Sequence, residues 1–278
     1  MRLNHRNALA LLAAFWERLR ASPALKALFL FAVVVLVSLA TATIPTVDES
    51  LFADAERFAF DQQMRLLREM HPRPLADDVV LIGTDEETYQ VFDEPLPLWH
   101  HHFADVMHAL ARAKPRAVGI DFVLPEKSFD RITPGIDLAM MRGLLDLKRS
   151  TVMVYVQTIG RDGNLVPVQP NYRSIVTEEN LGIDQHVRDI DAASRRFERL
   201  ASKKGEEIPT LVSQILRRLG LPVDQGYIDY SLGAPLGYVP MHRIAQMSDA
   251  ELRKTFENRI VLMGSLVGFV DRWRLPTK

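Results

Sequence analysis

Four short apolar runs recur along the chain after residue 77, and segments with the spacing of amphipathic helices separate them. A run of consecutive apolar or small residues is typical of a strand buried on both faces, as in a parallel sheet. Strand and helix in alternation predict an α/β fold with a largely parallel sheet and flanking helices. The expected strands are residues 78–84, 117–123, 151–157 and 259–264, and the expected helices are residues 101–113, 135–148, 209–219 and 247–257.

Two segments fit this alternation of strands and helices less well. Residues 226–231 alternate between polar and apolar positions, which indicates a strand nearer an edge of the sheet. Residues 178–207 carry many charges and a locally basic stretch. That stretch fits either a contact with an anion or lipid headgroup, or a solvated helix face paired with neighbouring acids. Its basic residues are Arg188, Arg195, Arg196, Arg199, Lys203 and Lys204.

The longest apolar stretch lies near the N-terminus, at residues 27–44, and contains no charged residue. About 18 apolar residues is near the lower limit for crossing a bilayer core. A cleaved signal peptide is the alternative, because residues 40–42 read Ala-Thr-Ala, a small-residue cleavage pattern. Signal peptides usually have a shorter apolar core, of roughly 7–15 residues. We therefore expect one transmembrane helix that is retained as an anchor.

The charges around this stretch are asymmetric, with basic residues before it and acidic residues after it. By the positive-inside rule, residues 1–26 lie in the cytoplasm and residues 45–278 lie outside the membrane. The expected protein is single-pass in the cell inner (plasma) membrane, with its main domain in the periplasm or outside the cell.

Residues 49–70 follow the anchor with helical spacing and end before His71-Pro72, so they predict a helical stalk. A continuous apolar face on this helix suits either of two roles. It packs into the core of the main domain, or part of it pairs with a second copy of the chain in a homodimer. The residues assigned to pairing and signal transmission are Leu51, Phe52, Ala55 and Phe58.

Composition narrows the classes of function. The chain has 34 basic and 35 acidic residues, so no basic surplus points to nucleic acid. It has no cysteine, which excludes disulfides, thiolate metal sites and cysteine nucleophiles. Neither a catalytic triad nor a glycine-rich phosphate loop is recognisable, so we expect no enzymatic activity and no cofactor.

Acidic residues lie at or after the C-terminal ends of the expected strands. Asp85 and Glu86 come at the end of the first, Asp121 lies at the C-terminal end of the second, and Asp271 and Arg272 come after the last. The carboxyl ends of parallel strands form the edge where α/β sheets bind ligands. These residues are therefore the candidate ligand site, and carboxylates placed there also suit a divalent cation. Capping of the following helices is the structural alternative.

Three consecutive histidines, residues 100–102, suggest a metal site. Successive helical residues point about 100° apart, so the three cannot all bind one ion. His101, Asp105 and His108 share one helix face and form a better set of two histidines and one carboxylate. Such spacing also arises by chance in amphipathic helices, so we expect no bound metal.

Several phrases, in order, resemble the CHASE2 domain, the extracytoplasmic sensor module of bacterial transmembrane receptors. They include VVLIGTDEETY at residues 79–89, PLPLWHHHFADVMHALARAKPRAVGIDFVLPE at 95–126 and FENRIVLMGSLVGFVDRWRLP at 256–276. The resemblance covers residues 50–278. The segment similar to the family's Asp-Gly-x-x-Arg turn has Ala192 in place of glycine, which puts the turn geometry in doubt.

The resemblance implies a sensor that responds to a small-molecule or protein ligand and signals to a cytoplasmic output domain beyond this chain, either a cyclase, a diguanylate cyclase or a kinase. The alternative function is a membrane-anchored, metal-dependent hydrolase that uses Asp85 and Asp121. The missing base and phosphate-binding apparatus favours the sensor.

Overall fold

The structure is a computed structural model that describes residues 22–43, 49–74, 77–123, 126–160, 164–201, 207–232, 237–267 and 275–276. Most of the expected cytoplasmic segment, residues 1–21, lies outside this part of the chain. The chain divides into two compact units, Met1–Ala59 and Phe60–Lys278, and each is described by itself.

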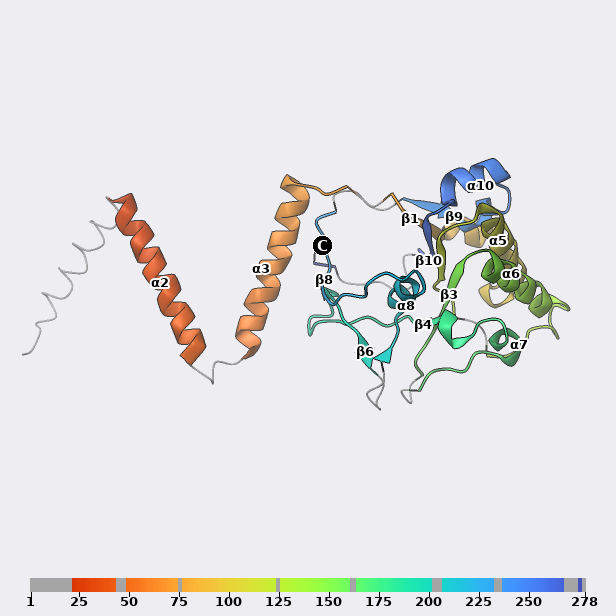
Figure 1. Ribbon diagram of the computed structural model, residues 1–278, viewed down its shortest axis with the longest axis horizontal. Coiled ribbons are helices and arrows are strands. Elements are labelled where there is room, and N and C mark those ends of the chain that lie inside the picture. Colours follow the sequence, from red (N-terminus) through yellow and green to blue (C-terminus); the bar gives the residue numbers. More distant parts are fainter. Residues whose placement is uncertain are drawn as a thin grey trace, which may run out of the picture. The chain divides into compact units, whose positions relative to one another are not determined.

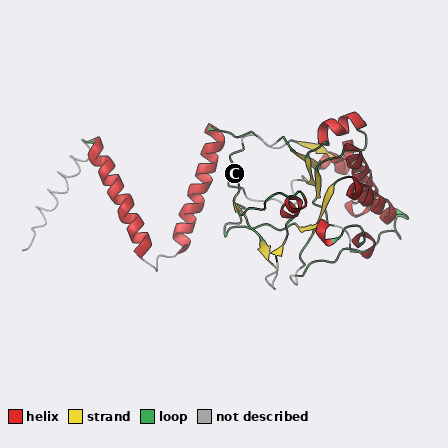
Figure 2. Ribbon diagram, viewed as in Figure 1, coloured by secondary structure: helices red, strands yellow, loops and turns green. Residues whose placement is uncertain are grey.

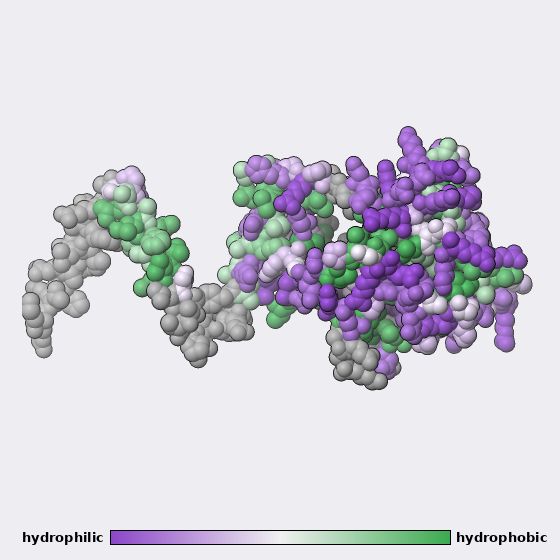
Figure 3. Space-filling view, viewed as in Figure 1, coloured by the Kyte–Doolittle hydropathy of each residue, from purple (hydrophilic) through white to green (hydrophobic). Residues whose placement is uncertain are grey.

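The first unit contains helix α2 (Pro23–Thr43) and the beginning of helix α3 (Glu49–Met70). The described side chains of α2, residues 23–38, are exposed and almost all apolar, as Figure 3 shows. Within the described part of the chain, no helix is both long and apolar enough to cross a membrane. The expected transmembrane helix at residues 27–44 therefore stays a prediction.

The second unit is built on a six-stranded sheet in which every neighbouring pair is parallel (Figures 1 and 2). This confirms the predicted α/β fold with a largely parallel sheet. In spatial order the strands are β4 (Leu181–Ile183), β3 (Val152–Gln157), β2 (Ala117–Ile120), β10 (Ile260–Ser265), β1 (Val79–Thr84) and β9 (Tyr238–Pro240).

Helices cover both faces of this sheet. The larger core joins α5, α6, α9 and α10 to one face, and the smaller core joins α8 to the other. The helices and short 3-10 turns of this unit are α4 (Glu86–Val91), η1 (Leu96–Leu98), α5 (His100–Ala113), α6 (Ile136–Ser150), α7 (Pro170–Arg173), η2 (Glu178–Asn180), α8 (Leu211–Arg218), α9 (Met241–Ile244) and α10 (Asp249–Phe256).

Side chains alternate between the two cores because successive residues of a strand point to opposite faces. On β2, Val118 and Ile120 belong to the larger core, whereas Ala117 packs in the smaller core with Val154 of β3 and Ile215 of α8. Both faces are apolar, which explains why these strands read as continuous apolar runs in the sequence.

The segment at residues 226–231 was expected to be an edge strand of the sheet, and this was wrong. Only β8 (Gly226–Tyr227) is extended there, and it pairs antiparallel with β5 (Arg196–Phe197) away from the main sheet. A second small pair joins β6 (Leu200–Ala201) to β7 (Glu207–Ile208). The true edge strands, β4 and β9, have three residues each, too few for a detectable period.

Helices α5 and α6 approach closely at one glycine. A Cβ added at Gly143 of α6 would lie 2.7 Å from Cα and 3.2 Å from the carbonyl oxygen of Ala104 on α5. Backbone atoms at this distance cannot move aside as a flexible side chain can. The contact therefore fixes the spacing of the two helices that cover the carboxyl ends of β2 and β3.

Gly143→Ala tests this contact. In an open helix the change would stabilise by about 0.5–1 kcal/mol, because alanine restricts the unfolded chain. Here overpacking against Ala104 should lower the free energy of unfolding by about 1–3 kcal/mol. The neighbouring exposed Arg142→Ala serves as the control in urea unfolding, and we expect it to change stability by less than about 0.5 kcal/mol. A gain in stability for Gly143→Ala would contradict the close approach.

Candidate functional site

The carboxyl ends of three strands are tied side by side at one edge of the sheet. Strand β10 lies between β1 and β2. The Asp121 amide, just after β2, donates to the Met263 carbonyl of β10 at 2.7 Å, and the Leu266 amide donates to the Thr84 carbonyl of β1 at 2.9 Å. The segments that follow β1, β2 and β10 therefore start from one edge, which is where ligands bind in α/β sheets.

Asp85 is the N-cap of helix α4. Its Oδ1 accepts hydrogen bonds from the Thr88 amide at 2.9 Å and the Thr88 hydroxyl at 2.8 Å. Its Oδ2 accepts from the Tyr238 hydroxyl at 3.0 Å. Burial alone would raise the pKa of Asp85, but these hydrogen bonds outweigh it and hold the pKa below the ordinary value. Oδ1 thus makes the capping contact that the sequence left open as the alternative, and Oδ2 is held by Tyr238 of β9.

The other residues of the predicted ligand site are placed differently. Glu86 lies exposed in the first turn of α4, and Asp121 lies exposed at the end of β2. Asp271 and Arg272 lie outside the described residues. The ligand role of these four residues stays a prediction.

Asp121 lines a cavity of about 290 Å³, called here the edge pocket. The pocket continues past the end of β4, at Asp184 and His186, to the segment that carries Ser194 and Arg196. Polar residues such as Asp121, His186 and Arg196 line this space together with apolar residues such as Val187 and Leu211, so it suits a small occupant with both polar and apolar groups.

Next to the edge pocket lies a buried arginine. Arg195 is 2% exposed, and all five of its N–H donors are used. It makes two bonds to Asp61 at 2.7 and 2.8 Å, two to Asp191 at 2.8 Å and one to Asp189 at 2.8 Å. The hydrogen bonds to Asp191 and Asp61 raise the pKa of Arg195, so this guanidinium is permanently charged. We call these four residues the arginine hub.

The hub is not the solvated helix face that was one reading of the basic stretch. Residues 189–193 form a tight turn, in which the Ala192 amide donates to the Asp189 carbonyl at 2.8 Å and the Asp189 amide donates to the Ala193 carbonyl at 2.9 Å. Ala192 takes a left-handed conformation with φ of 63°. Alanine therefore takes a backbone conformation that glycine favours, at the position where the Asp-Gly-x-x-Arg pattern has glycine.

The hub joins this turn to helix α3, because Asp61 lies on α3. Two further contacts hold the same stretch of helix. The Phe60 ring stacks on Tyr227 with centroids 4.8 Å apart, and Arg65 Nε donates to the Pro276 carbonyl at 3.3 Å. The part of α3 after Ala59 is thus fastened to the sheet unit by one buried charge network and two lesser contacts.

The stalk residues expected to pair with a second copy are only partly visible. Phe58 is 65% exposed, and Ala55 is also exposed. The side chains of Leu51 and Phe52 lie outside the described part. Leu66 and Met70 add exposed apolar positions further along the same helix.

A second, largely apolar cavity of about 440 Å³ lies beyond the ends of β2 and β3. Rings of Phe103, Phe122, Phe129 and Tyr155 line it, and His100 supplies a polar group. Aromatic walls with few polar groups are typical of small-molecule pockets. We call this space the apolar pocket.

Behind His100 lies a buried polar cluster. The Tyr172 hydroxyl donates to Asp137 Oδ1 at 2.7 Å, and His100 Nδ1 lies 3.6 Å from the same oxygen. Burial lowers the pKa of His100, and the charge of Asp137 opposes this shift. Gln169 donates to Asp137 Oδ2 at 3.2 Å, which leaves the buried Gln169 Oε1 without a hydrogen-bond partner in the described part. The cluster fixes the orientation of the His100 ring.

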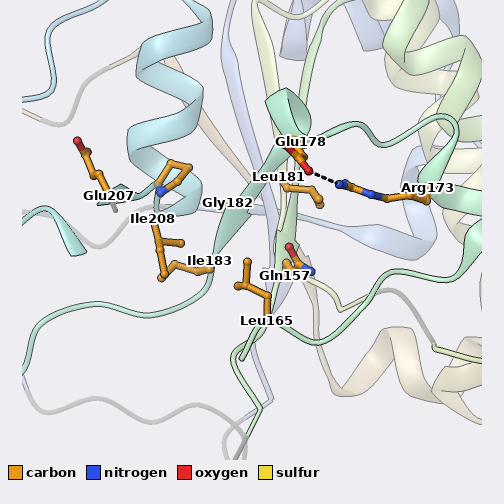
Figure 4. A pocket seen from close by; sticks show the side chains of 10 residues that line it. Gln157, Leu165, Arg173, Glu178, Leu181, Gly182, Ile183, Glu207 and Ile208 are labelled. Atoms are coloured by element: carbon orange, nitrogen blue, oxygen red, sulfur yellow. Dashed lines mark hydrogen bonds and ion pairs between the residues drawn. The ribbon is translucent and has the colours of Figure 1, made fainter. Parts of the chain in front are cut away.

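A third cavity, of about 390 Å³, lies along edge strand β4 (Figure 4). Leu181, Ile183 and Ile208 form its apolar part. Its charged lining residues are Arg173, Glu178 and Glu207, of which Arg173 and Glu178 pair with each other at 2.8 Å.

The three consecutive histidines do not converge, as expected from helical geometry. His100 turns inward to Asp137, whereas His101 and His102 face Glu94. The set of His101, Asp105 and His108 is not brought together, because His108 Nδ1 pairs with Asp146 Oδ2 on α6 at 2.9 Å. Among the described residues, the side chains that lie within reach of one ion include His101 but neither Asp105 nor His108.

The sequence alone did not identify the hub or the His100 cluster as sites. Asp61 and Arg195 are 134 residues apart, and no local spacing predicts such a pair. The one available signal was the Asp-rich segment with its following arginine, and the missing glycine made it look doubtful.

Asp85→Asn tests the capping role. The folded pKa lies below the ordinary value of 3.8, so the ionised carboxyl stabilises the fold at neutral pH, and this contribution is lost as the pH falls through the folded pKa. Asparagine also caps helices, so the loss comes from the carboxylate charge at the helix N-terminus, and we expect Asp85→Asn to lower the free energy of unfolding by about 0.3–1 kcal/mol at pH 7. The difference from wild type should shrink below about pH 4. Exposed Asp121→Asn is the control, and an equal loss in both variants at all pH values would contradict the cap.

Ala192→Gly tests the turn. Alanine in the left-handed region costs about 1–2 kcal/mol, and glycine loses about 0.5–1 kcal/mol in backbone entropy on folding. We therefore expect the free energy of unfolding to rise by about 0.5–1 kcal/mol. The control is Ala111→Gly inside α5, which should lower it by about 1 kcal/mol. If both variants lose stability alike in urea unfolding, the strain at Ala192 is absent.

Comparison with known proteins gives one family. The CHASE2 domain family matches residues 29–278, which is nearly the whole chain. A search of curated proteins finds no match. A search of solved structures also finds none. The family match covers the sheet, the hub and both pockets, and the family consists of extracytoplasmic sensor domains of signalling receptors. The chain therefore belongs to the CHASE2 domain family.

Proposed function

We propose that this chain is the ligand-sensing part of a membrane receptor, and that α3 carries its signal. A ligand in the edge pocket would shift the turn at residues 189–193, and the arginine hub would pass that shift to α3. The observation that carries the proposal is the bidentate contact of buried Arg195 with Asp61 of α3, at 2.7 and 2.8 Å.

The edge pocket supports this route because it shares backbone with the hub. Ser194 and Arg196 line the pocket, and Arg195 lies between them in the chain. Arg196 also pairs with Asp189 of the hub at 2.9 Å. A ligand that draws Arg196 toward it would therefore disturb a residue that holds Arg195. Buried ion pairs have strict geometry, so a small displacement has a large energetic effect.

The ligand in this proposal is a small polar molecule or a polar segment of a protein. Asp121 contributes from β2, and the predicted ligand residues Glu86, Asp271 and Arg272 belong to segments that begin at the same edge of the sheet. Asp85 takes part as the cap that fixes the start of α4. No nucleic acid is expected as a partner.

We assign the membrane anchor to residues 27–44, with residues 1–26 in the cytoplasm and the sheet unit in the periplasm or outside the cell. The exposed apolar side chains of α2 support this assignment, and so does the asymmetry of charge in the sequence. The signal would reach a cytoplasmic cyclase, diguanylate cyclase or kinase, with the receptor working as a homodimer paired through α3.

A sensing role also fits Asp85 better than hydrolysis does. A hydrolase that holds a metal between Asp85 and Asp121 needs free carboxylate oxygens at both. The oxygens of Asp85 accept bonds from Thr88 and Tyr238 instead. The proposal therefore gives the chain no catalytic step.

Cysteine crosslinking in membranes tests the route. The chain has no cysteine, so single cysteines at residues 51–60 of the full chain are unique reporters. A paired α3 should give crosslinks that peak every three or four positions, since this is the period of one helix face. Asp61→Asn, which weakens the pair with Arg195, should move those peaks by one or more positions or flatten them.

The matched control is Asp54→Asn on the same helix, because Asp54 pairs with Arg57, three residues along that helix. It should leave the peaks in place. Thermal unfolding of each variant checks that the sheet unit stays folded. Uniformly weak crosslinking in the parent would contradict pairing through α3. Identical peaks in the parent and in Asp61→Asn would contradict the hub as the route of the signal.

A further inference from the structure

Two histidines and one glutamate come together where α5 begins. Glu94 lies in the loop before η1, and His101 and His102 lie in the first turn of α5. Glu94 Oε2 is 3.2 Å from His102 Nε2, and Glu94 Oε1 is 3.6 Å from His101 Nε2. One ligand atom from each residue lies within 4.8 Å of the others. Among the described residues, this is the one such group of three metal-ligating side chains.

The spacing of these atoms is close to that of a tetrahedral metal site. Bonds of about 2.0–2.1 Å to a central Zn²⁺ place ligand atoms roughly 3.3 Å apart. The two measured distances, 3.2 Å to Glu94 Oε2 and 3.6 Å to Glu94 Oε1, lie on either side of this value, and one ligand atom from each residue fits within 4.8 Å. Rotation of the exposed His101 ring is the adjustment needed to close the third edge, since its side chain is 41% exposed.

The surroundings hold two of the three ligands in place before any ion arrives. The His102 ring stacks on Phe92, with centroids 3.6 Å apart and planes 5° from parallel. The indole Nε1 of fully buried Trp99 donates to the Glu94 carbonyl at 2.6 Å. Residues that fix the orientation of ligands in this way are typical of metal sites.

We propose that Glu94, His101 and His102 bind a divalent transition-metal ion of the Zn²⁺ type. Two imidazoles and a carboxylate suit Zn²⁺, Co²⁺ or Ni²⁺, whereas Mg²⁺ and Ca²⁺ select oxygen ligands. Three protein ligands leave a fourth position open for water or for a group from another molecule. This site is separate from the edge pocket and does not depend on the proposed sensing route.

The ion would act on a neighbouring part of the structure. Glu94 lies before η1 and His101 after it, and the η1 residues Leu96 and Pro97 line the apolar pocket. An ion that joins Glu94 to His101 would therefore close this segment into a loop fixed at both ends. We expect metal binding to slow amide exchange at residues 95–98.

Calorimetric titration with ZnCl₂ tests the site, on the untagged full chain in detergent after treatment with a chelator. We expect one ion per chain. Glu94→Gln and His101→Gln each remove one ligand from a part-exposed position, so they should fold normally and weaken affinity at least tenfold. His108→Gln is the matched control, because His108 lies on the same helix and pairs with Asp146 instead. Its affinity for Zn²⁺ should equal that of the parent.

Two melting-temperature measurements show whether a change in affinity comes from the proposed site. Zn²⁺ should raise the melting temperature of the parent and of His108→Gln, but not that of Glu94→Gln. MgCl₂ at the same concentration should raise neither. The proposal is overturned if Zn²⁺ binds equally well to Glu94→Gln and His101→Gln, or if all three variants lose affinity alike. Failure here would leave the crosslinking result on α3 untouched, so the two proposals can be judged separately.

Discussion

The contact between Arg195 and its three carboxylates is the constraint on which the functional part of this structure depends. A guanidinium that is 2% exposed is tolerated only when its charge and all its donors are matched, and here Asp61, Asp189 and Asp191 match all five. Two of these partners lie in one turn, and the third lies on helix α3. Removing any partner would leave one or more buried N–H donors of Arg195 unpaired, so the turn and the helix hold each other in one arrangement.

The parallel sheet decides what lies beside this hub. With β10 between β1 and β2, the segments that leave these strands start from the same edge, and the edge pocket extends from Asp121 to Ser194 and Arg196. The start of α5 serves two further sites. His100 turns inward to the apolar pocket and Asp137, while His101 and His102 turn outward to Glu94. The first turn of α5 thus contributes to both the apolar pocket and the cluster at Glu94, because its successive residues point in different directions.

Backbone strain, close helix packing and a helix cap occur at residues that position the arginine hub and the carboxyl edge of the sheet. Ala192 accepts a left-handed conformation so that Asp189 and Asp191 can both face Arg195. Gly143 lets α6 approach α5, whose first turn carries the histidines. The Asp85 cap fixes the start of α4 behind β1. Each feature is local and modest in energy, and together they keep the carboxyl edge of the sheet in one geometry.

The sequence by itself determined the α/β class, four of the six parallel strands and the main helices, because buried strands and amphipathic helices leave periodic patterns of apolar residues. It also placed acidic residues at the carboxyl edge. Only the tertiary structure decided that Asp85 caps a helix, that Glu94 rather than Asp105 faces His101, and that Asp61 meets Arg195. Strands β4 and β9 were missed because three residues are too few to show a period. The contact between Asp61 and Arg195 joins residues 134 apart, which no local spacing encodes. The Asp85 cap and the Glu94 contacts are local, but the sequence pattern allows them without selecting them over the alternatives.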